Sequence, residues 1–253
     1  MLAVLECANR LSIITVKAIS QECDIPASTV VRILETLCAE QYLVHVSRRG
    51  GYVLTSKVQA LSAGFHGAPL IVEILKAYAN ELTRLYLWPF SVATLDRDAM
   101  VVQYSSIPFS PLAHVRSTLH KRLSLASRAH GLAYVAFCSS KERSHLVRSI
   151  ASSARPEDWL VNNPRDWMRL LMQTRRRGYA VRVPDVDPST RSIAVPILLE
   201  PGRVVATLGM TFFSRSVDDE KAVFYAMSLK TIAGTAAGRI RDAIAYAASR
   251  SAA

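Results

Sequence analysis

The sequence predicts an α+β protein of two domains, a small one rich in helices followed by a larger one of mixed helices and strands. The first observation is a helical pattern of apolar residues, broken by a proline, in the first 40 residues. The second is a series of alternating apolar runs, flanked by helical patterns, in the rest of the chain. Since the chain has 253 residues and 50% of them are hydrophobic, both domains can bury a core.

The smaller domain is predicted from its order of elements. Apolar periodicity predicts three helices, over residues 1–9, 15–23 and 27–40. Two short apolar strands are expected at 43–46 and 52–54. Thr15 can cap the second helix, and Pro26 suits the start of the third. Helix, helix, turn, helix and a β-hairpin with a basic tip is the order of a winged helix-turn-helix, which we assign to residues 1–55.

Candidate DNA-binding residues lie on the third predicted helix. Its apolar residues share one face, namely Val30, Ile33, Leu34 and Leu37. Ser28, Thr29 and Arg32 are left on the outer side, where hydroxyl groups can hold phosphate and arginine can bind guanine. At the hairpin tip, Arg48 and Arg49 can reach phosphates or a minor groove. The alternative is a capped helix start with a solvated arginine, beside an exposed basic turn.

The positive charge of the chain does not by itself indicate DNA binding. The net charge is +11, but residues 1–66 hold 6 Lys and Arg against 5 Asp and Glu. Residues 67–253 hold 25 against 15, so nearly all of the excess lies there. Either a generally arginine-rich surface or an anionic partner of the larger domain explains this distribution.

The larger domain is predicted from strand pairs between helices. A helix at 56–66 is expected to form a linker, residues 56–68, before a domain over 69–253. The helices of this domain are expected at about 70–87, 127–138, 164–177 and 218–247. The strands are expected at 90–95, 99–104, 191–199 and 204–213. Turn signals separate the two strands of each pair, which indicates antiparallel hairpins in an α+β sensor-like domain.

Several classes of protein are disfavoured. No stretch approaches 18 uncharged apolar residues and the start lacks the pattern of a signal peptide, so no membrane association is expected. Four widely spaced cysteines suit reduced thiols in a cytoplasm. No nucleophile, zinc-protease or phosphate-loop motif occurs, so neither catalysis nor a cofactor is expected. His114, His120 and His130 match no familiar metal spacing, and Asp185 and Asp187 lie in a predicted turn.

Three stretches are the most distinctive: TVKAISQECDIPASTVVRILETLCAEQYL, then GYVLTSKVQALSAGF, then RRRGYAVRVPDVDPSTRSIAVPIL followed by VVATLGMTF. In this order they resemble the isocitrate-lyase-regulator (IclR) family of bacterial transcription factors. WPFSVATLDRDAMVV and HKRLSLASRAHGLAYVAFCS look closest to members that control catabolism of phenylpropionates and related aromatic acids. The resemblance implies a winged helix-turn-helix, a linker helix and a C-terminal effector domain of GAF-like fold. It also implies a homodimer or tetramer on a near-palindromic DNA operator.

The resemblance also implies an effector pocket. Carried over by position, its lining would be Leu123, Ala129, His130, Arg182, Arg191, Ser192, Gly209 and Thr211. Where some members have a small residue this chain has His130, and where some have an acidic residue it has Arg182. Both differences favour an anion, since arginine can hold a carboxylate through two hydrogen bonds while an aromatic ring stacks on an apolar wall. The alternative is that His130 and Arg182 are surface or core residues.

The leading interpretation is a ligand-responsive transcription factor without an enzymatic step. Its expected partners are double-stranded operator DNA, a small organic acid, expected to be aromatic, and further copies of the chain. The alternative is a small-molecule-binding protein or enzyme whose winged helix mediates protein contacts, which the near-neutral charge of residues 1–66 motivates.

Overall fold

The computed structural model of the protein describes residues 1–11, 14–46, 51–62, 70–152 and 156–251. The chain divides into two compact units, Met1–Gly67 and Ala68–Ala253. No described helix has the length and apolar character needed to cross a membrane.

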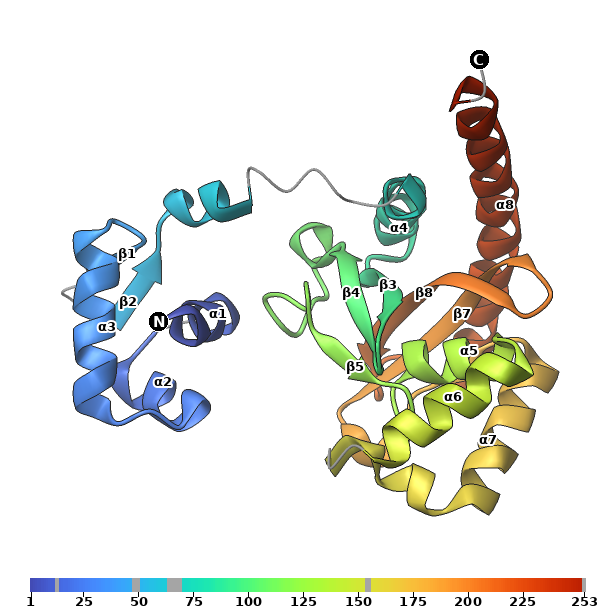
Figure 1. Ribbon diagram of the computed structural model, residues 1–253, viewed down its shortest axis with the longest axis horizontal. Coiled ribbons are helices and arrows are strands. Elements are labelled where there is room, and N and C mark those ends of the chain that lie inside the picture. The colour runs from blue at the N-terminus through green and yellow to red at the C-terminus, as the bar shows by residue number, and fades with distance from the viewer. Residues whose placement is uncertain (12–13, 47–50, 63–69, 153–155, 252–253) are drawn as a thin grey trace. The chain divides into compact units, whose positions relative to one another are not determined.

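The first unit contains three helices and a two-stranded antiparallel sheet (Figure 1). Its elements are α1 (Leu2–Arg10), α2 (Val16–Cys23), α3 (Ala27–Ala39), β1 (Leu43–Val46), β2 (Gly51–Leu54) and a 3-10 helix, η1 (Ser56–Ser62). The expected cap is confirmed, because the Thr15 hydroxyl accepts a hydrogen bond from the Ala18 amide at 3.2 Å. Val30, Leu34 and Leu37 are buried in the core of this unit, as their spacing predicts.

The turn between α2 and α3 is held by local hydrogen bonds. Asp24 ends α2 in the left-handed region, with φ 51°, and its amide donates to the Ser20 carbonyl. The Ser20 hydroxyl donates to the Ile25 carbonyl at 2.7 Å. These contacts set the direction in which α3 leaves the turn.

The second unit is built on a six-stranded antiparallel sheet in the order β5-β4-β3-β8-β7-β6. Its strands are β3 (Phe90–Asp96), β4 (Ala99–Ser105), β5 (Arg122–Ser124), β6 (Ala180–Val181), β7 (Thr190–Glu200) and β8 (Arg203–Phe213). The two expected hairpins are therefore present, and β8 lies beside β3, which joins them into one sheet. An α+β architecture is confirmed for this unit.

Helices cover both faces of the sheet (Figure 1). One face packs on α4 (Leu70–Tyr86) and α8 (Asp219–Ser251), and the other on α5 (Ala129–Phe137), α6 (Ser140–Ala151) and α7 (Pro164–Arg177). Short 3-10 helices are η2 (Ile107–Phe109), η3 (Pro156–Asn162) and η4 (Pro184–Val186). The helix α6 and the strands β5 and β6 were not predicted from the sequence. For α6 a signal was present, since Ser139 accepts from the Glu142 amide at 3.2 Å in the Ser-x-x-Glu pattern of a helix start.

Strand alternation gives the two faces of the sheet different chemistry. On β8, Leu208, Met210 and Phe212 belong to the core beneath α4 and α8. Between them, Thr207, Gly209 and Thr211 face the α5 side, where they contact His130 or Ser192. The face toward α5 thus carries small and polar residues near one end of the sheet.

Gly131 lets α5 approach the segment that precedes it. A Cβ atom at Gly131 would lie 2.2 Å from the Ser124 carbonyl oxygen and 2.4 Å from the Leu125 Cα, which are backbone atoms and cannot move aside easily. The residues around this contact, Leu125, Leu132 and Ala133, are fully buried.

Gly131→Ala should therefore lower the free energy of unfolding of the second unit by about 3 kcal/mol or more, because overpacking displaces backbone. The matched control is Gly234→Ala in α8, where an added Cβ meets nothing within 4 Å. That control should raise the stability by about 0.5–1 kcal/mol through helix propensity. Denaturant unfolding measures both, and a Gly131→Ala protein as stable as the wild type would contradict the close contact.

Candidate functional site

A cavity of about 210 Å³ lies in the second unit between the first turn of α5, the strands β3, β4 and β8, and the loops that precede β5 and β7. The apolar part of its lining includes Phe90, Val102, Ile107, Val115, Leu123 and Met210. The volume is below the roughly 300–1,000 Å³ of sites for drug-sized ligands, so it suits a small molecule.

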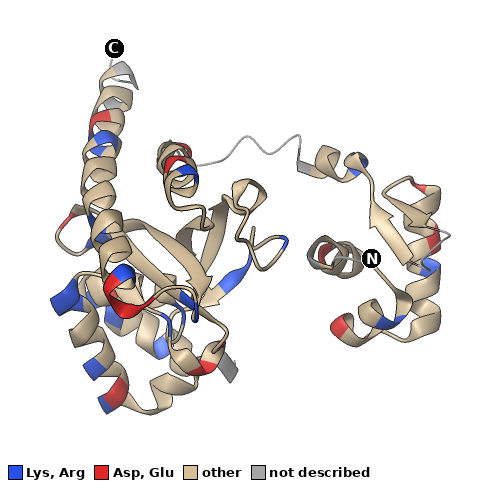
Figure 2. Cartoon of the chain, turned by 180° about the vertical axis from the view of Figure 1, so that it is seen from behind, with Lys and Arg blue, Asp and Glu red and all other residues tan. Residues whose placement is uncertain are grey.

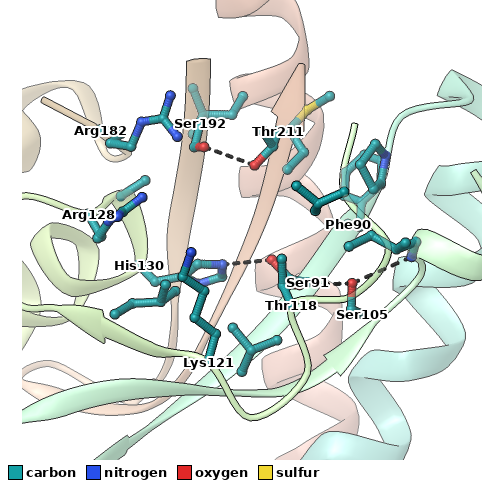
Figure 3. Close-up of a pocket in the computed structure, with 18 of the residues that line it drawn as sticks. Phe90, Ser91, Ser105, Thr118, Lys121, Arg128, His130, Arg182, Ser192 and Thr211 are labelled. Atoms are coloured by element: carbon teal, nitrogen blue, oxygen red, sulfur yellow. Dashed lines mark hydrogen bonds between the residues drawn. The ribbon is translucent and has the colours of Figure 1, made fainter. Parts of the chain in front are cut away.

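Positive charges dominate the polar part of the lining. Lys121, Arg128 and Arg182 line the cavity, and Asp187 is the one acidic residue among the described residues that do so. Figure 3 shows Arg128 and Arg182 on one side of the cavity, with Phe90 and Ser105 on the other. This distribution of charge favours an anionic ligand.

One guanidinium nitrogen of Arg182 donates hydrogen bonds to the loop that precedes β7. Its Nη2 donates to the Asp187 carbonyl and to the Thr190 hydroxyl, each at 2.8 Å, and to the Thr190 carbonyl. Nε and Nη1 have no hydrogen bond to any described residue, and the side chain is only 7% exposed. Burial lowers the pKa of Arg182; the carboxylate of Asp187 opposes this effect and the charge of Arg128 adds to it.

Asp187 is held in its charged form by the same loop. Ser189 donates to it through its hydroxyl at 2.6 Å, and the Thr190 hydroxyl donates at 2.6 Å. These hydrogen bonds lower the pKa of Asp187 to about 2. The carboxylate is thus occupied by protein donors, while its Oδ2 lies 3.7 Å from Nη2 of Arg182.

His130 is a buried and neutral side chain at the start of α5. Its Nδ1 lies 2.7 Å from the Thr207 hydroxyl and its Nε2 lies 2.8 Å from the Ser91 hydroxyl (Figure 3 shows the second contact). Burial lowers the pKa of His130 to about 4, so the ring is uncharged at neutral pH. His130 therefore adds no positive charge to the cavity at neutral pH, and the cationic groups of the lining are Lys121, Arg128 and Arg182.

The structure brings most of the predicted pocket residues together. Those that line the cavity are Leu123, Ala129, His130, Arg182, Ser192 and Thr211. Gly209 lies behind the His130 ring, since a Cβ there would be 2.8 Å from Nε2. Their roles toward a ligand stay a prediction.

Arg191 does not line the cavity, contrary to the sequence-based expectation. It lies on the opposite face of the sheet, where its Nη1 is 2.8 Å from Asp219 and its guanidinium is 5.7 Å from the centre of the Phe212 ring. The reason is strand alternation: Ser192 faces the α5 side of the sheet, where it contacts Thr211, so its neighbour Arg191 points to the α8 side and to Asp219.

The polar residues of the site that were not predicted include Ser91, Lys121, Arg128 and Thr207. Thr207 could have been found, because it shares a strand face with Gly209 and Thr211. Ser91, Lys121 and Arg128 reach the site only through the pairing of β3 with β8 and the path of the chain around β5, which no local pattern encodes.

In the first unit, Ser28, Thr29 and Arg32 are exposed on α3. No side chain caps the start of this helix, so the alternative that Ser28 and Thr29 serve as caps is not supported. Arg48 and Arg49 lie outside the described residues. Within the part of the chain that is described, no three His, Cys, Asp or Glu side chains are arranged to hold a metal ion.

Comparison with known proteins gives the class of this chain. Residues 69–237, which contain the cavity, match the family model described as the bacterial transcriptional regulator IclR C-terminal domain. The match covers more than half of the chain. The protein therefore belongs to the IclR family of bacterial transcriptional regulators.

Individual relatives agree with this membership. The chain is 24% identical over 220 residues to the HTH-type transcriptional regulator KdgR of Escherichia coli (strain K12), covering 87% of this chain and 83% of that protein. Its fold is similar to the crystal structure of the Thermotoga maritima IclR, with a TM-score of 0.67 and 19% identity over 94% of this chain and 95% of the other. It is also similar to an IclR homolog from Microbacterium hydrocarbonoxydans, solved in complex with 4-hydroxybenzoate, with a TM-score of 0.61 and 18% identity over 95% and 97% of the two chains.

The burial of neutral His130 makes stability depend on pH. The unfolded chain binds a proton at this side chain near pH 6.5, whereas the folded chain does so only near pH 4. The free energy of unfolding should therefore fall as the pH drops from about 6.5 to about 4, by up to roughly 3 kcal/mol from this group. In His130→Asn this part of the decline should be absent, while above pH 7 the two curves run parallel. Denaturant unfolding at a series of pH values measures both curves, and equal slopes between pH 6.5 and 4 would contradict the buried neutral ring.

Proposed function

We propose that this protein is a ligand-responsive regulator of genes for aromatic-acid catabolism, whose first unit binds operator DNA and whose cavity binds a small carboxylate. The observation that carries the proposal is the cavity, in which Nε and Nη1 of buried Arg182 have no hydrogen bond to a described residue and lie among further cationic side chains beside an apolar wall. An apolar ring and a carboxylate satisfy these two parts together.

Three features support an aromatic acid in particular. Phe90 and Leu123 offer apolar surface on which a ring can pack. Arg128 and Ala129 place the start of α5 at the cavity, where the helix dipole favours negative charge. The 4-hydroxybenzoate in the structure of the Microbacterium homolog is a ligand of this chemical class.

In the first unit the proposed DNA-binding element is a winged helix-turn-helix over residues 1–55, followed by a linker over 56–68 and an effector domain of GAF-like fold over 69–253. In this interpretation α3 enters the major groove with Ser28, Thr29 and Arg32 toward the DNA, and Arg48 and Arg49 contact the backbone or minor groove. Acidic and basic residues are intermingled on this unit, as Figure 2 shows, so we expect few phosphate contacts.

A homodimer or tetramer would present two copies of α3 to a near-palindromic operator, about 34 Å apart. Exposed apolar side chains on α4 and α8 support self-association: Leu85, Phe224 and Met227 are 67%, 57% and 49% exposed. Binding of the effector would shift the population between arrangements that differ in DNA affinity.

The proposal is tested by a thermal-shift screen of aromatic carboxylates, followed by a gel shift on DNA from upstream of the gene. A ligand at a hundred times its dissociation constant adds about 2.7 kcal/mol of stability. The proposal requires both a stabilising acid and a DNA complex that responds to it. If the DNA does not shift on the gel, with or without acids, the result would instead favour a binding protein or enzyme whose first unit contacts other proteins.

Arg32→Ala should weaken operator binding by about 1–3 kcal/mol, because a bidentate arginine-guanine contact is lost. Arg84→Ala, an exposed arginine on α4 in the other unit, is the matched control and should leave operator binding unchanged. Fluorescence anisotropy with labelled operator measures both affinities. Equal affinities of the Arg32→Ala and wild-type proteins would show that α3 does not read the DNA through this residue.

Arg128→Ala should weaken the binding of benzoate roughly 10- to 100-fold, because a charged hydrogen-bond donor at the cavity is removed. Arg128 is a sharper probe than Arg182, whose replacement would also release the loop at Thr190. Arg176→Ala, an exposed arginine on α7, is the control. Isothermal titration calorimetry gives the affinities, and an unchanged value for Arg128→Ala would exclude this residue from the anion site.

A further inference from the structure

The polar groups around His130 form a chain of hydrogen bonds that ends in the cavity. The chain runs from the Ala93 carbonyl on β3 to the Thr207 hydroxyl on β8, at 3.4 Å, and from there to Nδ1 of His130 at 2.7 Å. On the other side of the ring, Nε2 lies 2.8 Å from the Ser91 hydroxyl, and Ser91 lines the cavity.

The direction of this chain follows from its first member. A backbone carbonyl can only accept, so Thr207 gives its hydroxyl proton to Ala93. In this arrangement Thr207 accepts from His130, and the proton of the neutral ring is assigned to Nδ1. Nε2 is left with a lone pair, and the Ser91 hydroxyl donates to it.

The consequence is that Ser91 offers the cavity lone pairs and no proton. Its hydroxyl has no other hydrogen bond among the described residues. The cationic side chains of Arg128 and Arg182, in contrast, can only donate. The cavity therefore has a donor side and an acceptor side, and Figure 3 shows Ser91 on the far side of the His130 ring from Arg128.

We propose that Ser91 determines the specificity of the site by accepting a hydrogen bond from a hydroxyl group of the effector, with Thr207 and His130 as positioning residues that keep Ser91 an acceptor. The effector class is thus a hydroxylated aromatic carboxylate, and ligands with only an acceptor or a fluorine at that position are disfavoured. This inference rests on the proposed binding of a carboxylate in the cavity.

The test is calorimetric titration of the full-length protein with matched ligands. The panel pairs 3- and 4-hydroxybenzoate and 3-(4-hydroxyphenyl)propionate with their fluoro and methoxy counterparts, with benzoate as the reference. At least one hydroxylated acid should bind about tenfold more tightly than its fluoro counterpart, as expected for one hydrogen bond. In Ser91→Ala this preference should disappear while the affinity for benzoate is kept, which also shows that the variant is folded.

A second variant tests the direction of the chain. Thr207→Val removes the acceptor of Nδ1, so the ring is free to protonate Nε2 and the preference for the hydroxylated acid should fall, whereas Thr207→Ser should retain it. Nitrogen NMR of His130 at pH 7 should find the proton on Nδ1 in the wild type. A proton on Nε2 would overturn the assignment of Ser91 as an acceptor.

The outcomes separate the two levels of the proposal. If carboxylates bind but the hydroxy and fluoro acids bind equally, the role of Ser91 is overturned and the carboxylate site stands. If Ser91→Ala keeps the full preference, the hydroxyl is recognised elsewhere and the role of Ser91 is again overturned. If no member of the panel binds, both the aromatic-carboxylate function and the inference that rests on it are overturned.

Discussion

The close packing of α5 on the sheet is the contact on which the rest of the second unit depends. It requires Gly131 against the backbone of Ser124 and Leu125, and Gly209 beneath the ring of His130. Because the helix lies this near, its first turn reaches over β8 and β3 and brings His130 between Thr207 and Ser91. The same position puts the start of the helix at the wall of the cavity. The hydrogen bonds of His130 in the site therefore depend on the two glycines that let α5 pack closely on the sheet.

Burial and hydrogen bonding decide what each polar group of the cavity can do. His130 is kept neutral by burial and is occupied at both nitrogens. Asp187 is kept charged, but its oxygens are taken by Ser189 and Thr190. Among the described residues, Nε and Nη1 of Arg182 on one side and the lone pairs of Ser91 on the other are then left for a ligand. A count of charges in the sequence would not have given this division.

Local patterns predicted the elements of this fold well and its long-range contacts poorly. The hairpins of the sheet follow from alternation and turn residues, and the cap at Thr15 follows from its position before α2. The polar α6 lacked a strong apolar period and was missed. Most of the predicted pocket residues were taken from the family resemblance and do line the cavity. Arg191 was assigned to the pocket by its position in the motif, although it alternates with Ser192 on the strand and faces Asp219 instead. Ser91 is in the site because β3 pairs with β8, a contact between residues far apart in the sequence.

Arg182 closes its own loop through Thr190 and faces the cavity with the rest of its guanidinium. A substitution of Arg182 removes the hydrogen bonds to Thr190 that hold the loop, together with a positive charge of the cavity. The shape of this loop and the charge of the cavity therefore depend on the same side chain. Lys121, in contrast, is exposed at the edge of the cavity. A substitution at Arg182 is therefore expected to change the shape of the loop together with the charge of the cavity, whereas a substitution at the edge of the cavity changes the charge alone.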